Sequence, residues 1–209
     1  LKLSDTDKFD KTLLNFDRRI YIHKLPKSNK KKWIPSKVLN KKTVLIIGNS
    51  PEIKENLYAI ENFIKREKPI VFGLNTQKSI NEKLINYRVV CNLFRLLTDK
   101  QKYKFIKKPL ILPFERLNKN ILKYLKKNKL LNFDLQVTPG EFKFKKDLVI
   151  CPNSLVVSYA LAIAASGNAS NIVLAGFNGY DLDDPRQLDM ELTFSIFNSK
   201  SKIQISSIT

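Results

Sequence analysis

The stretch TVLIIGNSP, residues 43–51, decides the fold of this chain. Its first five residues form a short apolar run, typical of a strand buried in a parallel sheet, and Gly48-Asn49-Ser50-Pro51 then turns the chain. The segment after the turn carries apolar residues at helical spacing: Ile53, Leu57, Ile60 and Ile64. A strand, a small-residue turn and a helix form the commonest anion or nucleotide site of α/β proteins.

Apolar runs and helix-compatible stretches alternate along most of the remaining chain. Strands are expected at Pro69–Leu74, Tyr87–Leu93, Pro109–Pro113, Asp147–Cys151 and Asn171–Ala175. Helices are expected at Glu52–Arg66, Thr98–Lys107, Leu117–Lys129 and Leu155–Ser166, and a loop or small hairpin at 130–147. Gly167 or Asn168 is the expected C-cap of the last of these helices. This order predicts an α/β fold with an open, mostly parallel, Rossmann-like sheet and helices on both faces.

The two ends of the sequence differ from this pattern. Residues 1–42 are polar and lysine-rich and are expected to form a linker or N-terminal arm, with 43–209 as one α/β domain. The one histidine, His23, lies in the arm and is expected to be a surface residue. Residues 203–209, IQISSIT, alternate like a strand with no closing element, and the first residue is not Met, so a piece of a longer protein is expected.

Composition limits the function classes. The 209 residues carry a formal charge of +19, which favours a polyanionic partner, either a membrane surface or nucleic acid. However, the lysines are spread along the chain among many Asn and Ile, as an AT-rich genome would encode. The sequence has no arginine stripe, RNP-like pattern or zinc spacing, so no specific nucleic-acid partner is expected.

Compartment and redox state follow from equally simple features. Cys91 and Cys151 end apolar runs, so both are expected to be reduced, buried thiols. No run of eighteen apolar residues and no signal-peptide pattern occurs. A cytoplasmic location is expected, with peripheral contact with the anionic inner face of the membrane as an option.

Small polar residues follow several of the predicted strands, where ligands bind in open α/β sheets. They are Gly48, Asn49, Ser50, Asn75, Asn92 and the segment Gly176–Tyr180, with Asn153 and Ser154 at a helix start. Asparagine offers a donor and an acceptor to sugar hydroxyls, phosphates and base edges, although each residue alone is more often a turn or cap. GNSP is neither GxGxxG nor a Walker loop, so a dinucleotide or ATP site is weakly supported.

The ordered set IIGNSP, FGLN, VCN, PNSLVVSYALAIAASG and IVLAGFNGY resembles the bacterial α-2,3-sialyltransferase family and related sugar-transferase domains, over roughly residues 43–180. The resemblance implies a nucleotide-binding α/β domain that uses CMP-sialic acid and needs no metal or other cofactor. Gly48, Asn49 and Ser50 would lie by the CMP phosphate and ribose, and Asn75 and Asn92 by the nucleotide and donor sugar. Asn153 and Ser154 would lie by the sialic acid carboxylate, and Tyr180 would steady the leaving phosphate.

One departure from that family concerns catalysis. The family's general base is a histidine downstream of the tyrosine, whereas this sequence has none after His23, and DLDDPR (Asp181–Arg186) stands in the following segment. A missing base costs about 10²–10⁴-fold in rate. Asp181, Asp183 or Asp184 is the candidate substitute, although an acidic Asp-Pro turn is more often a capped loop.

The domain is also similar to one fused behind a pyruvate-aldolase-like barrel in bacterial surface-polysaccharide gene clusters. Two functions therefore remain open. One is a glycosyltransferase-like domain that binds a nucleotide sugar, with a CMP-linked nonulosonic acid as donor and a glycan as acceptor. The other is a catalytically silent nucleotide-sugar-binding module attached to, or partnering, an aldolase-like enzyme.

Overall fold

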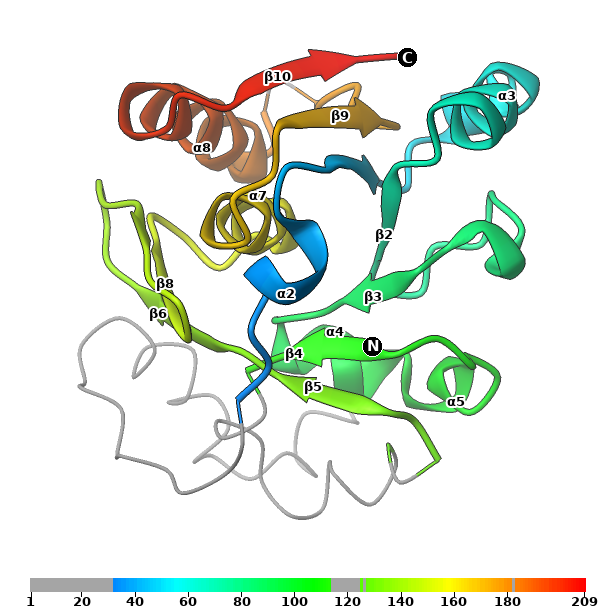
Figure 1. Ribbon diagram of the computed structural model, residues 1–209, viewed down its shortest axis with the longest axis horizontal. Coiled ribbons are helices and arrows are strands. Elements are labelled where there is room, and N and C mark those ends of the chain that lie inside the picture. The colour runs from blue at the N-terminus through cyan, green and yellow to red at the C-terminus, as the bar shows by residue number, and fades with distance from the viewer. Residues whose placement is uncertain (1–31, 114–124, 126, 182) are drawn as a thin grey trace.

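The computed structural model describes residues 32–113, 125, 127–181 and 183–209 (Figure 1). Strands and helices alternate along much of this part of the chain, except that β5 to β8 follow one another without a helix between them. The first half contains α2 (Ser36–Leu39), β1 (Thr43–Ile47), η2 (Pro51–Ile53), α3 (Leu57–Glu67), β2 (Ile70–Leu74), η3 (Glu82–Leu84), β3 (Tyr87–Val89), α4 (Leu93–Thr98), α5 (Lys100–Tyr103) and β4 (Leu110–Leu112). The second half contains β5 (Leu130–Asn132), β6 (Asp134–Val137), β7 (Lys143–Phe144), β8 (Leu148–Cys151), α7 (Val156–Ser166), β9 (Asn171–Ala175), α8 (Pro185–Lys200) and β10 (Gln204–Ser207).

The main sheet has seven strands in the order β10-β9-β1-β2-β3-β4-β5, and every pair in it is parallel. Strand β1 lies at its centre, where Leu45 is in register with Val71 of β2 and Val173 of β9. This confirms the predicted open parallel sheet. Because all strands run the same way, their carboxyl ends share one edge and their amino ends share the other.

Helices cover both faces of the sheet, as predicted. Helices α7 and α8 lie on one side in Figure 1, and α3 and α5 on the other. Successive residues of β1 serve the two faces, because side chains alternate along a strand. Val44 and Ile46 join the core that contains α7, whereas Leu45 and Ile47 join the core that contains Ile60 of α3.

Helix α7 is the most deeply buried helix of the described residues. Its residues from Val157 to Ala164 are all buried, and the three alanines among them help it to pack between the main sheet and a second sheet. The second sheet has three strands in the order β6-β8-β7. The phenol of Tyr159 on α7 donates a hydrogen bond to the carbonyl oxygen of Phe133, where the chain passes from one sheet to the other.

Several boundaries differ from the sequence-based expectation. The strand expected at Asp147–Cys151 exists as β8, but it lies in the second sheet. The region 130–147 is not a simple hairpin, since β5 completes the main sheet and β6 pairs with β8. The third strand is shorter than expected, because α4 begins at Leu93. The expected helix at Leu117–Lys129 lies almost wholly outside the described residues.

The chain ends of the described region pack onto the same core. Leu39 of α2 is fully buried, and the Trp33 amide donates to the carbonyl oxygen of Asn132 at 2.8 Å. Residues 1–31, with His23, lie outside the described residues. The strand expected near the end of the chain is confirmed as β10, which pairs with β9. In the described part of the chain, no helix combines the length and apolar character needed to cross a membrane.

Candidate functional site

The turns after β1 and β9 contact each other at the carboxyl edge of the main sheet. The Gly48 amide donates to the carbonyl oxygen of Ala175 at 2.8 Å, and the Ser50 amide to that of Gly176 at 3.4 Å. A Cβ on Gly48 would lie only 2.3 Å from the Gly176 oxygen. Glycine at position 48 is therefore required for this approach of two backbones.

Position 176 also requires glycine, because of its backbone conformation and its close neighbours. Its φ is +75°, in the left-handed region, and an added Cβ would lie 2.4 Å from Cδ1 of Ile53. Its amide donates to Oγ1 of Thr209, which follows the edge strand β10. The turn after β9 is thus fixed by backbone conformation and by neighbours on both sides.

This pair of turns marks the topological switch point of the sheet. From β1 the chain proceeds through β2, β3, β4 and β5 in one direction, and β9 and β10 then lie on the other side of β1. Ligands of open α/β proteins bind outside the carboxyl ends of the strands where the strand order reverses. The candidate site is therefore the carboxyl edge around β1 and β9, which includes the predicted residues of GNSP and GFNGY.

The predicted residues of GNSP have different roles. Oγ of Ser50 accepts a hydrogen bond from the Glu52 amide at 3.4 Å and caps η2. Asn49 is exposed, and within the described part of the chain its side chain has no hydrogen-bond partner. Of these side chains, Asn49 is the one that is available to a ligand.

Asn75 and Asn92 lie at the ends of the next two strands. Asn92 caps α4, since its Oδ1 accepts from the Arg95 amide at 3.0 Å. Asn75 has φ +50°, and its amide donates to the Val89 carbonyl at 2.9 Å. Its Oδ1 is buried and has no hydrogen-bond partner among the described residues. An unpaired buried acceptor at a strand end is costly, so Asn75 is suited to a ligand that donates a hydrogen bond.

The side chain of Asn153 connects α8 to the start of α7. It is 5% exposed, and its Nδ2 donates to the carbonyl oxygen of Asp189 at 2.8 Å and to Oγ1 of Thr193 at 2.9 Å, both on α8. Its Oδ1 accepts from the Leu155 amide just before α7. The Ser154 carbonyl oxygen accepts from Sγ of Cys91 at 3.4 Å, which places this loop beside the end of β3. Asn153 is therefore a positioning residue.

Tyr180 is held by the first turn of α8, which the sequence did not predict as a helix. The Tyr180 amide donates to Oε1 of Gln187 at 2.8 Å, and the Arg186 guanidinium lies 4.4 Å from the centre of the phenol ring. The tyrosine remains 38% exposed. Arg186 is a cation that sequence reasoning missed at this position, and it gives the phenol an electropositive neighbour.

The three aspartates proposed as general base, Asp181, Asp183 and Asp184, differ in their partners. Asp184 caps α8 and forms a two-pronged ion pair with Arg186, whose hydrogen bonds hold the pKa of that carboxyl below its usual value. This makes it a poor proton acceptor. Asp181 and Asp183 are exposed, and neither carboxylate has a hydrogen-bond or ion-pair partner within the described residues. Asp181 adjoins Tyr180 and remains the candidate base.

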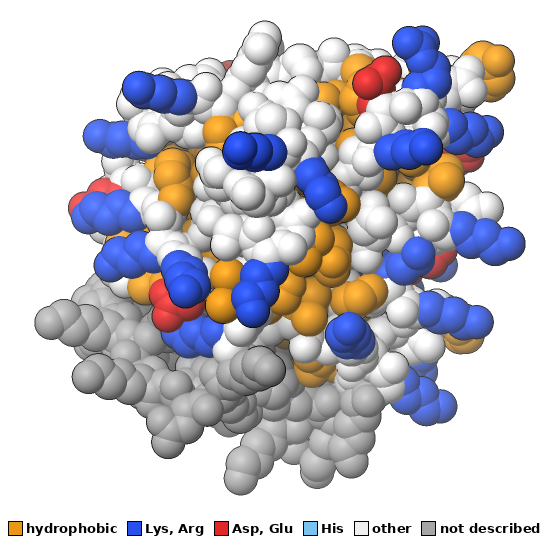
Figure 2. Space-filling model, in the orientation of Figure 1, with side chains coloured by type: hydrophobic (Ala, Val, Ile, Leu, Met, Phe, Trp, Pro, Cys, Tyr) orange, Lys and Arg blue, Asp and Glu red, His pale blue; other side chains and the backbone are white. Residues whose placement is uncertain are grey.

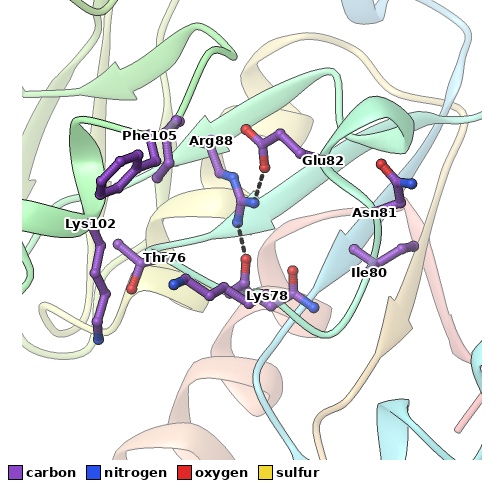
Figure 3. Close-up of a pocket in the computed structure, with 10 residues that line it drawn as sticks. Thr76, Lys78, Ile80, Asn81, Glu82, Arg88, Lys102 and Phe105 are labelled. Atoms are coloured by element: carbon purple, nitrogen blue, oxygen red, sulfur yellow. Dashed lines mark hydrogen bonds and ion pairs between the residues drawn. The ribbon is translucent and has the colours of Figure 1, made fainter.

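A cavity of about 360 Å³ opens directly after Asn75, between the segment 76–82 and the end of α5. Figure 3 shows Arg88 in its interior, with Lys102 and Phe105 on one side and Glu82, Asn81 and Ile80 on the other. The remaining lining residues are Thr76, Gln77, Lys78 and Ile106. Its volume falls in the range of small-molecule sites, about 300–1,000 Å³.

Two buried ionic groups organise this cavity: Arg88 lines its interior, and Asp99 contacts the lining residues Thr76 and Lys102. Arg88 is 2% exposed, and it donates to the Gln77 carbonyl at 2.7 Å and pairs with the Glu82 carboxylate. Gly73 on β2 leaves room for it, because a Cβ there would lie 2.9 Å from Nη1 of Arg88. An arginine within the apolar run YRVV is a sequence signal that could have revealed this interior.

The second ionic group is Asp99. Burial favours a raised pKa for its carboxyl, but hydrogen bonds from Lys102 and Thr76 and the charges of Lys102 and Arg95 lower the pKa below its usual value. Nζ of Lys102 lies 2.7 Å from Oδ1 of Asp99, and Oγ1 of Thr76 lies 2.8 Å from Oδ2. Asp99 thus stays ionised and fixes the threonine that follows Asn75. Lys78 is exposed at the cavity, where a second ammonium group is available to an anion.

Both cysteines are buried thiols that form no disulfide, as predicted. Burial raises the pKa of the Cys151 thiol well above its ordinary value, which suits a core residue. Among the described residues, no cluster of three or more His, Cys, Asp or Glu side chains is arranged to hold a metal ion. Compared with known proteins, the chain matches no family model and no curated sequence.

Proposed function

We propose that this chain is a glycosyltransferase-like domain that binds a nucleotide-activated sugar at the carboxyl edge of its main sheet. The observation that carries the proposal is the paired turn at the switch point, where Gly48 and Gly176 bring the ends of β1 and β9 together. The proposed donor is a CMP-linked nonulosonic acid, and the proposed setting is bacterial surface-polysaccharide synthesis. Both follow from the sequence resemblance to the α-2,3-sialyltransferase family.

In this proposal the donor lies along the edge from β1 to β3. The exposed Asn49 side chain contacts the ribose or phosphate, and Oδ1 of Asn75 accepts a hydrogen bond from the nucleotide. The cavity beyond Asn75 receives the remaining part of the nucleotide, where Phe105 offers a flat apolar surface and Lys78 offers a positive charge. These groups support the proposal, because each has a chemistry that suits one part of a nucleotide sugar.

The proposed reaction is an inverting displacement at the anomeric carbon. An acceptor hydroxyl oxygen forms the new glycosidic bond while the bond from the anomeric carbon to the CMP phosphate oxygen breaks. Tyr180 donates its phenol hydrogen bond to the departing phosphate, and Arg186 beside it favours the negative charge. Asp181 takes the hydroxyl proton of the acceptor.

A silent nucleotide-sugar-binding module is the second candidate, and a specific observation favours it. Of the carboxylates after Tyr180, Asp184 is engaged by Arg186, and Asp181 is exposed to solvent with no neighbouring side chain that fixes its orientation within the described residues. Such a module would bind the same ligand at the same edge and present it to a fused or partner aldolase-like enzyme. The two candidates therefore share a binding site and differ in turnover.

Thermal unfolding with CMP, CDP, UDP and GDP, each at millimolar concentration, tests the shared binding claim. Ligand at 100 times its Kd stabilises the folded state by about 2.7 kcal/mol, which is readily measured. We expect CMP to raise the melting temperature more than GDP does. Failure of all four nucleotides to raise it would reject both candidates.

Turnover then separates the transferase from the silent module. With a CMP-linked nonulosonic acid as donor, release of CMP above the buffer rate supports the transferase, and release at the buffer rate with every acceptor supports the silent module. In an active protein, Tyr180→Phe should lower kcat by about 10²-fold, the scale of one lost transition-state donor. Tyr58→Phe is the matched control, because Tyr58 is 81% exposed on α3.

A further inference from the structure

The amino edge of the main sheet gathers positive charge from segments that are far apart in the sequence. Lysines or arginines precede the strands β1, β2, β4, β5, β8 and β10, and thirteen of them form what we call the basic edge. They are Lys41, Lys42, Lys65, Arg66, Lys68, Lys107, Lys108, Lys127, Lys129, Lys145, Lys146, Lys200 and Lys202. All are exposed except Lys108, which is half-buried.

The fold explains why these residues meet. All strands of the main sheet are parallel, so every segment that enters a strand lies at the same edge. The segment before β8 reaches this edge as well, because Oγ of Ser166, at the end of α7, donates to the Lys145 carbonyl. Backbone bonds from the Lys41 amide to the Asn168 carbonyl and from the Ser170 amide to the Lys42 carbonyl complete the connection.

Few carboxylates offset the basic edge. Within the same described segments the acidic residues are Glu67 and Asp147. Oε1 of Glu67 lies 3.8 Å from Nη2 of Arg66. Oδ2 of Asp147 lies 3.4 Å from Nζ of Lys32, a further cation. Helix α2, which leads into β1, lies in front of the sheet in Figure 1. The space-filling view from that side shows Lys and Arg side chains over the described surface, with hydrophobic side chains between them and few acidic groups (Figure 2).

At the opposite, carboxyl edge, the segments that directly follow the strands carry fewer cations, although Lys78 and Arg186 lie just beyond them. Residues 48–52, 75–77, 90–92, 152–154 and 176–181 contain no Lys or Arg, and they include Glu52 and Asp181. A strand of five residues spans about 16 Å at 3.3 Å per residue. Asn49 at the candidate site and Lys41 and Lys42 of the basic edge are therefore at opposite ends of β1. A partner that docks at Lys41 and Lys42 leaves Asn49 open.

We propose that the basic edge docks this protein on an anionic lipid surface. The edge is broad, since seven strands at a spacing of about 4.8 Å extend over about 29 Å. Twelve of its thirteen cations are lysines, which act as point charges, and a diffuse anionic lipid surface attracts point charges without requiring a fixed geometry. Arginine forks, which read guanine and phosphate in nucleic-acid complexes, are nearly absent from these described segments.

Co-sedimentation of the full chain with lipid vesicles tests the proposal. The vesicles contain phosphatidylcholine alone, or phosphatidylcholine with 30 mol% phosphatidylglycerol, in 0.1 M salt. We expect binding to the anionic vesicles only, with a decrease as salt is raised. Equal binding to both vesicle types, or to neither, would overturn the proposal.

A matched pair of variants locates the binding surface. Lys41→Gln with Lys42→Gln removes two charges from the basic edge. Lys54→Gln with Lys143→Gln removes two exposed lysines from outside it. The first pair should weaken vesicle binding by an order of magnitude or more, and the second pair by much less. Melting temperatures within 2 °C of the wild type would establish that both variants fold.

Two outcomes of this comparison contradict a lipid-docking edge. Equal weakening by both pairs would mean that total charge, not the basic edge, governs the binding. Tight binding of a 20-base-pair DNA duplex without vesicle binding, weakened by the Lys41/Lys42 pair, would assign the edge to nucleic acid instead. Neither result bears on nucleotide-sugar binding, because Lys41 and Lys42 lie at the opposite end of β1 from Asn49.

Discussion

Replacing Gly48 with alanine tests the contact between the turns after β1 and β9. The new Cβ would lie 2.3 Å from the Gly176 carbonyl oxygen, about 1 Å closer than the usual C···O contact of about 3.3 Å. The obstacle is backbone, and it is held by the hydrogen bond from the Gly176 amide to Thr209. Relief therefore requires the two turns to separate.

The expected cost lies near the top of the range for overpacking, about 3 kcal/mol. For a chain of this size, 1 kcal/mol corresponds to about 2–4 °C, so the melting temperature should fall by about 6–12 °C. Urea unfolding should give a lower midpoint at an unchanged slope. CMP affinity should fall as well, because the separated turns no longer frame the switch point.

Gly140→Ala is the control for this experiment. Gly140 has φ +75° and no atom within 4 Å of an added Cβ, so its substitution costs only left-handed strain of about 1–2 kcal/mol. If Gly48→Ala is as stable as the wild type, or more stable than Gly140→Ala, the turns do not pack as described. The geometric basis of the candidate site would then be wrong.

Three further predictions test other parts of the structure. Asn153→Ala should destabilise the fold by about 2–3 kcal/mol, because buried groups on α8 lose their hydrogen-bond partner. The control is Asn198→Ala, at an exposed position of α8, which should change the stability little. Equal melting temperatures of the two variants would contradict the positioning role of Asn153. The pKa of Asp99 is lowered in the folded state, so its ionisation stabilises the fold above about pH 4, and this contribution is lost as pH falls through the folded-state pKa. The difference in unfolding free energy between the wild type and Asp99→Asn should therefore shrink from pH 6 to pH 3. A difference that does not depend on pH would refute this prediction. Burial raises the pKa of Cys151, so Ellman's reagent at pH 8 should label this thiol only after denaturation, whereas rapid labelling of the native protein would show that it is accessible.

The sequence predicted the main elements because burial on both faces leaves a strong signal. Runs such as VLII and IVLA have no polar residue, and the small-residue helix α7 is nearly as uniform. Strands β5 and β6 were harder to predict. They follow one another almost directly, and the transfer from one sheet to the other at Phe133 has no counterpart in the hydrophobic pattern. Pairing partners depend on the whole fold.

Helix α8 did have a local signal. Asp184 followed by Pro185 is the pattern of an N-cap and a first helical proline, but an acidic Asp-Pro pair also occurs in turns. The prediction chose the turn and so missed Arg186 and Gln187 beside Tyr180. The roles of the site asparagines could be predicted only in part. Capping by Asn92 is local, whereas the bonds from Asn153 to α8 span more than thirty residues.

The distribution of charge shows the same limit. Along the sequence the lysines look evenly scattered, which favoured the interpretation that an AT-rich genome, and not a binding partner, accounts for their number. In the fold, many of them fall before parallel strands and meet at one edge. The signal that could have revealed the basic edge was the recurrence of lysines just before successive predicted strands.

The central claim is that the carboxyl edge around Asn49 binds a nucleotide sugar, and calorimetric titration with CMP tests it most directly. The wild type should bind CMP saturably with one site, and Asn49→Ala should weaken the affinity by about tenfold, the value of one hydrogen bond to a charged group. Asn198→Ala, on the exposed surface of α8 near its end, should bind like the wild type. No heat of binding at millimolar CMP, or equal affinity in the Asn49 variant, would contradict the assignment of this edge.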